Sequence, residues 1–284
     1  MTTPSAQTDR FVHDRLPPRD QWPELRYDLP ELRIADQANL VERLLDGAAA
    51  RGWADRPLLR SPQITFTYAE TRERVDRIAN YLVHELKLEP GNRVLLRGGN
   101  SIGMALSWLA VVKAGLIAVA TMPLLRATEL SKVIDKAQPV AAICDARLLQ
   151  ELEQAQQAFP ALQHVLRFNS PDDPSDLGQL VAHQAATFTA CPTSADDIAL
   201  LAFTSGTTGA PKAVVHTHRD VLAACEAWPR HVLRPTSDDI VTGSPPLAFT
   251  FGLGGLLLFP MWAGASIYYP DANYNPETMV RQMR

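Results

Sequence analysis

Cysteine is scarce in this sequence, and the three cysteines that it has, Cys144, Cys191 and Cys225, are far apart. Their number is odd, and no two of them have the CxxC spacing of a redox or zinc motif. The sequence therefore lacks the disulfide framework of a small secreted domain. This pattern is typical of a reduced protein, and we expect a cytoplasmic location.

A basic excess and a targeting segment are also absent. The formal net charge is −4, so no nucleic-acid partner is expected, because such partners usually require a basic patch. The amino terminus has no apolar stretch of the kind found in signal peptides. Residues 243–269 carry no charge and are long enough to span a bilayer. Their three prolines and five glycines instead favour a buried loop, a helix and a strand, so no membrane span is expected.

What the sequence does contain is a regular alternation of short apolar runs and helical patterns. Five prolines among the first thirty residues predict an extended surface arm over residues 1–36. Beyond the arm, residues 93–98, 116–121 and 140–144 are short apolar runs, each followed by a helical pattern. This alternation predicts the α/β class, with mostly parallel β-sheets flanked by helices.

Polar stretches divide this α/β pattern. They predict a first α/β subdomain over residues 37–190 and the start of a second one over residues 191–284. Within the first subdomain, Thr67 and Glu70 have the T-x-x-E spacing of a helix capping box. Thr128 is expected to cap a later helix.

The segment "TSGTTGAPK", residues 204–212, follows an apolar strand and cannot form a core. Its glycines allow close backbone approach, its N–H groups can form an anion-binding nest, and Lys212 adds a cation. These features favour the phosphate tail of a nucleotide, although a solvated hairpin loop is the alternative. The P-loop pattern G-x-x-x-x-G-K-[ST] does not match, because Gly206 and Gly209 are only three residues apart. The sequence also lacks a DFG motif, so a kinase-like enzyme is disfavoured.

The longer stretch "LLAFTSGTTGAPKAVVHTH" resembles the signature loop of the adenylate-forming superfamily, which includes the acyl- and aryl-CoA synthetases. The resemblance implies that the chain is a partial N-terminal domain of such an enzyme. It also implies that the loop binds the β- and γ-phosphates of ATP. The residues matched to that role are Thr204, Ser205, Gly206, Thr207, Thr208, Gly209 and Lys212.

Other stretches resemble the same superfamily, among them "FTYAE" and "VVKAGLIAVATMP". The stretch "SPPLAFTFGLGG" lies where the superfamily places an aromatic residue and the wall of the acyl pocket. This implies that Phe249 is the aromatic residue and that Thr250, Phe251 and Gly252 line the pocket, with core packing alone as the alternative for Phe251. An apolar pocket with an aromatic wall suits an aryl acid, and within the superfamily the sequence is most similar to benzoate and 2-aminobenzoate CoA ligases.

The resemblance implies a ligase that uses a carboxylic acid, ATP, Mg²⁺ and coenzyme A. It forms acyl-AMP first and acyl-CoA second. In the superfamily, the catalytic lysine and an acidic residue that helps to bind Mg²⁺ lie beyond the part matched here. We therefore assign no catalytic residue, expect a missing C-terminal domain, and predict little or no turnover by these 284 residues alone. The alternative is a catalytically incomplete nucleotide-binding fragment or scaffold.

Two other groups of residues could suggest a metal site. His216 and His218 would lie on one face if both were in a strand, which is the arrangement that a pair of metal ligands needs. No cysteine or paired carboxylate nearby completes such a site, so structural histidines are favoured. Asp238 and Asp239 are expected to begin a strand in solvent, and no metal site is assigned.

Overall fold

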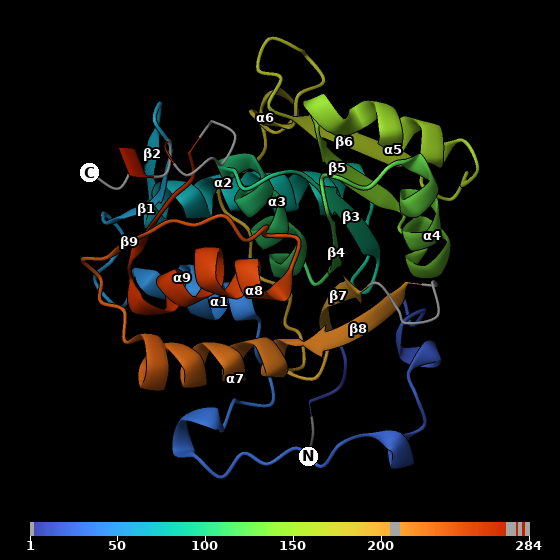
Figure 1. The fold of residues 1–284 in the computed structure, drawn as a ribbon. Helices are drawn as coiled ribbons and strands as arrows, with labels where there is room; N and C mark the ends of the chain where they lie inside the picture. Colours follow the sequence, from blue (N-terminus) through green and yellow to red (C-terminus); the bar gives the residue numbers. More distant parts are fainter. Residues whose placement is uncertain (1–2, 205–210, 271–276, 278–279, 282–284) are drawn as a thin grey trace.

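Figure 1 shows the computed structural model of the chain, which describes residues 3–204, 211–270, 277 and 280–281. Its strands form two sheets: one has the strand order β6-β5-β3-β4-β7-β8, and the other has the order β2-β1-β10-β9. Asn275 and Pro276, where a helix start could be read from the sequence, lie outside the described residues.

The six-stranded sheet has five parallel strands and one antiparallel edge strand. Its strands are β3 (Arg93–Arg97), β4 (Ile117–Thr121), β5 (Ala141–Asp145), β6 (His164–Phe168), β7 (Ile198–Thr204) and β8 (Lys212–Thr217). Along β3, Val94 and Leu96 belong to one apolar core and Leu95 belongs to another on the opposite face. Side chains alternate between the faces of a strand, so a sheet buried on both faces requires uninterrupted apolar runs. The predicted covered parallel sheet is therefore confirmed.

Helices cover both faces of this sheet, as Figure 1 shows. The outer face packs against α4 (Ala127–Ala137) and α5 (Leu149–Gln156). The inner face packs against α3 (Ile102–Lys113) and the neighbouring α2 (Tyr68–Asn80), which continues as a π-helical turn, Tyr81–Glu85. A short helix α6 (Leu177–Leu180) follows β6.

The four-stranded sheet is built from segments far apart in the chain. It contains β1 (Pro57–Arg60), β2 (Thr65–Thr67), β9 (Ile240–Val241) and β10 (Ser266–Tyr268). Leu59 of β1 pairs with Ile267 of β10 in parallel. In the other sheet, β4 pairs with β7. Strand pairing thus crosses the predicted boundary at residues 190/191 in both sheets, so the two predicted subdomains do not coincide with two separate sheets.

The remaining helices pack on the same inner core. They are α1 (Leu40–Leu44), α7 (His218–Trp228), α8 (Thr250–Leu253) and α9 (Phe259–Ala263), with a π-helical turn between α8 and α9, Gly254–Leu258. Residues 243–269 form a loop, short helices and strand β10, as the sequence predicts. Among the described residues, no helix has both the length and the apolar character needed to cross a bilayer.

The N-terminal arm is extended, with short 3-10 turns at His13–Arg15, Arg19–Gln21 and Pro30–Leu32. Its first part does not simply lie on the surface, because Gln7 is only 4% exposed. The Gln7 side-chain amide pairs with the backbone at the start of β7: its Nε2 donates to the Ile198 carbonyl (2.7 Å), and its Oε1 accepts from the Ile198 N–H (3.2 Å). The arm thereby covers the end of the sheet where the parallel strands begin.

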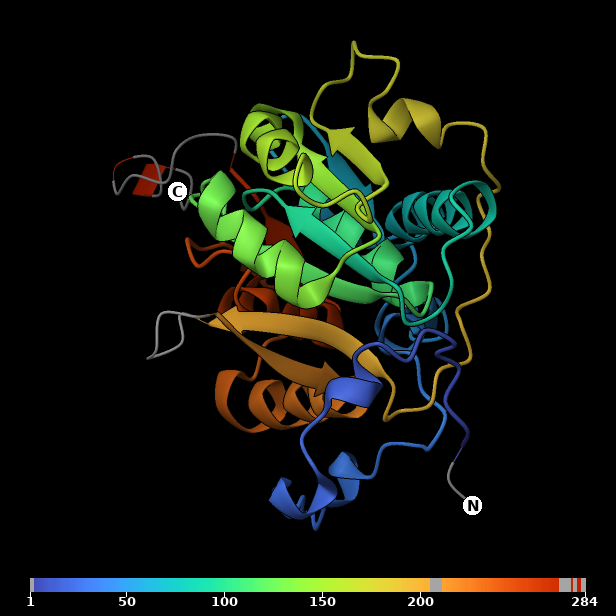
Figure 2. The same cartoon turned by 90° about the vertical axis from the view of Figure 1, so that its right-hand side faces the viewer.

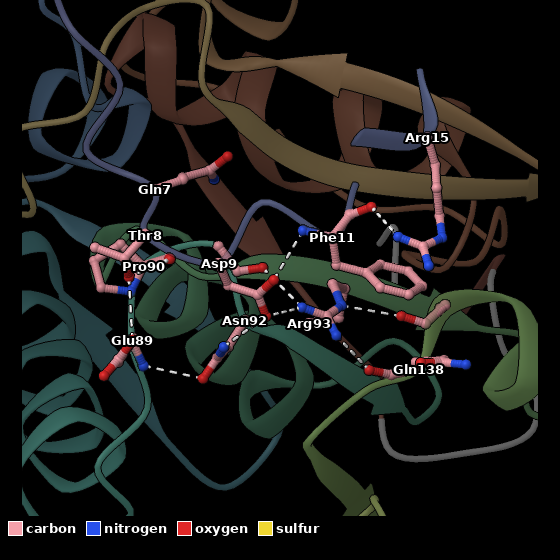
Figure 3. A network of polar contacts seen from close by, with 12 residues as sticks. Gln7, Thr8, Asp9, Phe11, Arg15, Glu89, Pro90, Asn92, Arg93 and Gln138 are labelled. Carbon is pink, nitrogen blue, oxygen red and sulfur yellow. Dashed lines mark hydrogen bonds and ion pairs between the residues drawn. The ribbon is translucent and has the colours of Figure 1, made fainter. Parts of the chain in front are cut away.

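Figure 3 shows how the arm is held a few residues further on. The Asp9 carboxylate accepts hydrogen bonds from the side chains of Arg93 and Asn92 and from the Phe11 N–H. The Phe11 ring lies between two guanidinium groups, 3.8 Å from Arg15 and 4.5 Å from Arg93. This cation–π arrangement and the ion pair fix the arm to the first residue of β3.

Helix capping agrees with the sequence at one helix and differs at another. The capping box of Thr67 and Glu70 is confirmed at the start of α2. The prediction that Thr128 caps α4 is wrong, because the helix already begins at Ala127. Two carboxylates satisfy its first N–H groups: Glu129 accepts from the Arg126 N–H, and Glu151 accepts from the Ala127 N–H. The second of these comes from another helix, so the local sequence does not indicate it.

Candidate active site

The predicted phosphate-binding loop connects the antiparallel strands β7 and β8, which lie side by side in Figure 2. Thr204 is the last residue of β7, and its register partner is Lys212, the first residue of β8. Both residues are exposed, and Lys212 makes no ion pair with the part of the chain that the structure describes. Ser205, Gly206, Thr207, Thr208 and Gly209 lie outside the described residues. The two described ends of the loop are therefore exposed and adjacent at one edge of the sheet.

The two described ends of this loop lie at the end of the sheet where open α/β sheets bind ligands. Strands β3, β4 and β7 are parallel, so Arg97, Thr121 and Thr204 mark their carboxyl ends. Ligands of such sheets bind in the crevice beyond these ends. The N-terminal arm, in contrast, covers the opposite end of the same strands.

Arg97, the last residue of β3, is a cation at this end of the sheet, but it is not available to a ligand. Its side chain is 1% exposed and donates to the backbone carbonyls of Met122, Pro123 and Leu125. Burial lowers the pKa of the Arg97 guanidinium, and the carbonyl oxygens stabilise its charge. Arg97 therefore fixes the connection between β4 and α4.

A small hollow lies between the sheet and the segment that contains Phe249. The empty space in and above it, including space open to solvent, is about 230 Å³. Its walls come from helices α3 and α8, strands β4 and β7, and the segment before α8. The lining residues are Trp108, Ala118, Ala120, Leu200, Leu201, Ala202, Leu247, Ala248, Phe249, Thr250 and Leu253.

The structure places the four predicted pocket residues in two different settings. Phe249 and Thr250 line the hollow, and Phe249 is 44% exposed. Phe251 is not among the lining residues and is 78% exposed. Gly252 is buried and packs against the preceding turn, where an added Cβ atom would lie 2.1 Å from the Pro246 carbonyl oxygen. The structure thus brings Phe249 and Thr250 together at the hollow, while Gly252 allows the close packing that shapes it.

Sequence reasoning missed the floor of this hollow. Trp108 lies on α3, and Ala118 and Ala120 lie on β4, far from Phe249 in sequence. Locally these residues look like ordinary core positions. The only sequence signal is the pair of small side chains at alternate positions in a strand of larger apolar residues.

The two histidines set aside as metal ligands are separated by the end of the strand. His216 is in β8, whereas His218 begins α7, so the premise that both would lie on one strand face is wrong. His218 is completely buried, and its Nδ1 accepts a hydrogen bond from the Leu40 N–H. Within the described ranges, no group of three or more His, Cys, Asp or Glu side chains could hold a metal ion. Asp238 is exposed and pairs with Arg56, and Asp239 caps the turn at Thr236.

The buried His218 predicts a pH dependence of stability. Burial lowers its pKa to about 3, whereas in the unfolded chain it should titrate near its ordinary value of 6.5. Between these values the unfolded state binds the extra proton, so stability is full above pH 6.5 and is lost as the pH falls. The contribution is up to about 1.4 kcal/mol per pH unit.

We expect His218→Asn, which keeps an acceptor for the Leu40 N–H, to flatten this dependence. Urea unfolding of both proteins between pH 7 and pH 4 would measure the difference in the free energy of unfolding. Parallel pH profiles for the two proteins would contradict the prediction.

The molecule belongs to the class of open, mostly parallel α/β domains, and its candidate ligand site lies at the carboxyl ends of the strands. The chain belongs to the AMP-binding enzyme family, whose match covers residues 47–284. The resemblance seen in the sequence to adenylate-forming enzymes is thereby confirmed.

Curated relatives include several ligases of aromatic acids. The benzoate–CoA ligase of Thauera aromatica is 27% identical over 255 residues, which are 90% of this chain and 48% of that protein. The anthranilate–CoA ligase of Pseudomonas aeruginosa is 30% identical over 209 residues, which are 69% of this chain and 38% of that protein. The chain spans about half the length, or less, of these curated relatives.

Solved structures give the same picture of the fold. The anthranilate CoA ligase AuaEII in complex with anthranoyl-AMP matches with a TM-score of 0.79 and 26% identity, over 86% of this chain and 46% of that chain. A benzoate CoA ligase from Burkholderia xenovorans LB400 matches with a TM-score of 0.76 and 23% identity, over 86% of this chain and 48% of that chain. The prediction of a partial N-terminal domain of an adenylate-forming enzyme is confirmed.

Proposed function

We propose that this chain is the N-terminal portion of an ATP-dependent carboxylate–CoA ligase that acts on an aryl acid such as benzoate or 2-aminobenzoate. The observation that carries the proposal is the position of the Phe249 hollow beside the end of β7, where the predicted phosphate-binding loop begins. Leu201 and Ala202 of β7 line the hollow, and Thr204 ends the same strand. One strand therefore connects an apolar site for an acid with a polar site for a triphosphate.

The proposed reaction has two steps. The carboxylate oxygen attacks the α-phosphorus of ATP, and pyrophosphate leaves, which gives acyl-AMP. The coenzyme A thiol then loses its proton and attacks the acyl carbon, and AMP leaves. In the first step both reactants are anions, so their approach requires positioning and charge compensation.

This chain's own residues would contribute to the first step. Lys212 is an exposed cation without a carboxylate partner among the described residues, so it is free to pair with a phosphate oxygen. The hydroxyl of Thr204, its register partner, is a neutral donor. Ser205, Gly206, Thr207, Thr208 and Gly209 stay predicted ATP contacts. Mg²⁺ would add charge neutralisation when bound, although no group of three or more His, Cys, Asp or Glu side chains among the described residues could hold it.

The hollow also supports a compact aromatic substrate. Phe249 and Trp108 give it aromatic walls, and the two alanines of β4 leave its floor open. The names of the curated relatives point to the same class of acid.

The test is substrate preference in the protein translated from the complete reading frame. Pyrophosphate release would be measured with benzoate, 2-aminobenzoate, acetate and decanoate at fixed ATP, Mg²⁺ and coenzyme A. We expect kcat/KM for the two aryl acids to exceed that for the others by at least about tenfold, since a filled apolar pocket contributes on the order of 1–3 kcal/mol. A higher value for decanoate would contradict the proposal.

The second candidate is a non-catalytic nucleotide-binding scaffold; the chain spans about half the length of the relatives that it matches. We predict that the 284-residue chain alone makes little or no acyl-CoA. A reading frame that stops after Arg284 would favour the scaffold. A continuation that carries further conserved ligase motifs would favour the ligase.

A further inference from the structure

We propose that Asn100 is a positioning residue for the acid site. Its side-chain amide holds the segment of residues 245–249 that carries Phe249, so that Phe249 stays over the hollow. The proposal rests on the proposed function for the identity of the ligand, but the hold on the segment can be tested independently of any activity.

The contact consists of two hydrogen bonds to the backbone. The Oδ1 atom of Asn100 accepts from the Leu247 N–H, and its Nδ2 atom donates to the Pro245 carbonyl, both at 2.8 Å. One amide thus uses its donor and its acceptor on two residues that flank Pro246. Pro246 has no backbone N–H, so this segment has one donor fewer with which to form other hydrogen bonds to the rest of the chain.

Asn100 is itself held by rigid elements. It follows β3 and directly precedes Ser101, which caps α3 by accepting a hydrogen bond from the Met104 N–H. The backbone at Gly98 approaches Phe168 so closely that an added Cβ atom would lie 2.7 Å from its ring. A side chain on such a support has little freedom, which is what a positioning residue needs.

The same helix also forms the floor of the hollow. Trp108 lies on α3, whose cap follows Asn100 in sequence, and it lines the hollow together with residues of the segment that Asn100 holds. Leu247, whose N–H is bonded to Asn100, lines the hollow too. A shift of the segment relative to α3 would therefore change the distance between the Phe249 wall and the Trp108 floor.

If Asn100 only stabilised the fold, its loss would raise KM no more than the loss of a similar asparagine elsewhere. Asn80 offers such a matched control. Asn80 also uses its side-chain Nδ2 to bridge two distant backbone groups, the carbonyls of Ala185 (2.9 Å) and Thr187 (3.0 Å). None of these three residues lines the hollow. Asn80→Ala removes a comparable pair of hydrogen bonds away from the candidate site.

The experiment compares wild type, Asn100→Ala, Asn100→Asp and Asn80→Ala. Hydrogen exchange would be measured at the Leu247 amide of the 284-residue chain, and KM for benzoate would be measured in the protein from the complete reading frame. In Asn100→Ala we expect at least about a tenfold loss of protection at Leu247 and at least about a tenfold rise in KM, because small misplacements of binding groups have large effects. Asn100→Asp keeps the acceptor for the Leu247 N–H, so it should show a smaller loss of protection and a smaller rise in KM. If Asn100→Ala does not fold, Asn100→Asp can be measured in its place.

The outcomes separate the two proposals. The positioning role is overturned if protection at Leu247 is unchanged in Asn100→Ala, or if Asn80→Ala raises KM as much as Asn100→Ala does. If wild type releases no pyrophosphate with any acid, the proposed ligase function fails, and so does the role of Asn100 in acid binding. The exchange result would then still show whether Asn100 holds the segment.

Discussion

Replacing Lys113 with methionine is expected to lower the free energy of unfolding by about 3–5 kcal/mol at neutral pH. Lys113 is 1% exposed, and its ammonium group contacts two carboxylates, Asp46 at 2.6 Å and Asp76 at 2.5 Å. Methionine fills most of the same volume but leaves both carboxylates without their cation. Breaking a buried ion pair from one side is costly because the remaining charge stays desolvated.

The pH dependence of this loss has a definite sign. Burial raises the pKa of both Asp46 and Asp76 in the folded chain, and Lys113 counteracts that effect through its hydrogen bonds and charge. Without Lys113 the folded state should favour the protonated carboxyls more strongly, so the loss should shrink as the pH falls toward 5. Denaturant unfolding of wild type and variant at pH 7 and pH 5 would measure it.

Lys132→Met is the matched control, since Lys132 is an exposed lysine on α4. It should change the free energy of unfolding by no more than about 0.5 kcal/mol. If Lys113→Met were as mild as this control, the buried triad would contribute nothing measurable, and the prediction would be wrong.

Replacing Gly252 with alanine is expected to reduce acid-dependent pyrophosphate release by about a hundredfold in the protein from the complete reading frame. The added Cβ atom would lie 2.1 Å from the Pro246 carbonyl oxygen, so the backbone must move. Pro246 also accepts the hydrogen bond of the Phe249 N–H. Any movement of Pro246 therefore displaces the residue that is proposed to bind the acid.

Gly255→Ala provides the control three residues further along. Apart from its chain neighbours and its own helical backbone, no atom lies within 4 Å of its added Cβ position, so alanine should be tolerated there. Activity of Gly255→Ala should stay close to that of wild type. Equal activities of the two variants would show that the close contact at Gly252 does not control the site.

A feature of the fold could be predicted from the sequence when residues close together in the chain determine it. The strands of the six-stranded sheet and the Thr67 capping box were predictable, because periodicity and capping act within one element. The cap of α4 was not, since Glu151 reaches it from another helix. The pairing of β1 with β10 depends on tertiary packing, which no local pattern records.

The candidate site shows the same division. The ends of the predicted phosphate loop, Thr204 and Lys212, were identified from local composition and from the resemblance, and the structure places them opposite each other. The floor at Trp108 and the contact of Asn100 with residues 245–247 were missed. Both depend on packing between segments more than a hundred residues apart, where each residue taken alone looks like ordinary core or loop.

The pairing of β1 with β10 has a consequence for how the molecule is made on the ribosome. Leu59 is synthesised early, but its parallel partner Ile267 emerges only near the end of these residues. At typical elongation rates of about 5–20 residues per second, the interval is roughly 10–40 seconds. Throughout that time the nascent chain exposes an apolar strand edge, while β3, β4, β5 and β6 can already pair among themselves. Translation speed and chaperone binding should therefore influence the yield of the four-stranded sheet more than that of its neighbour.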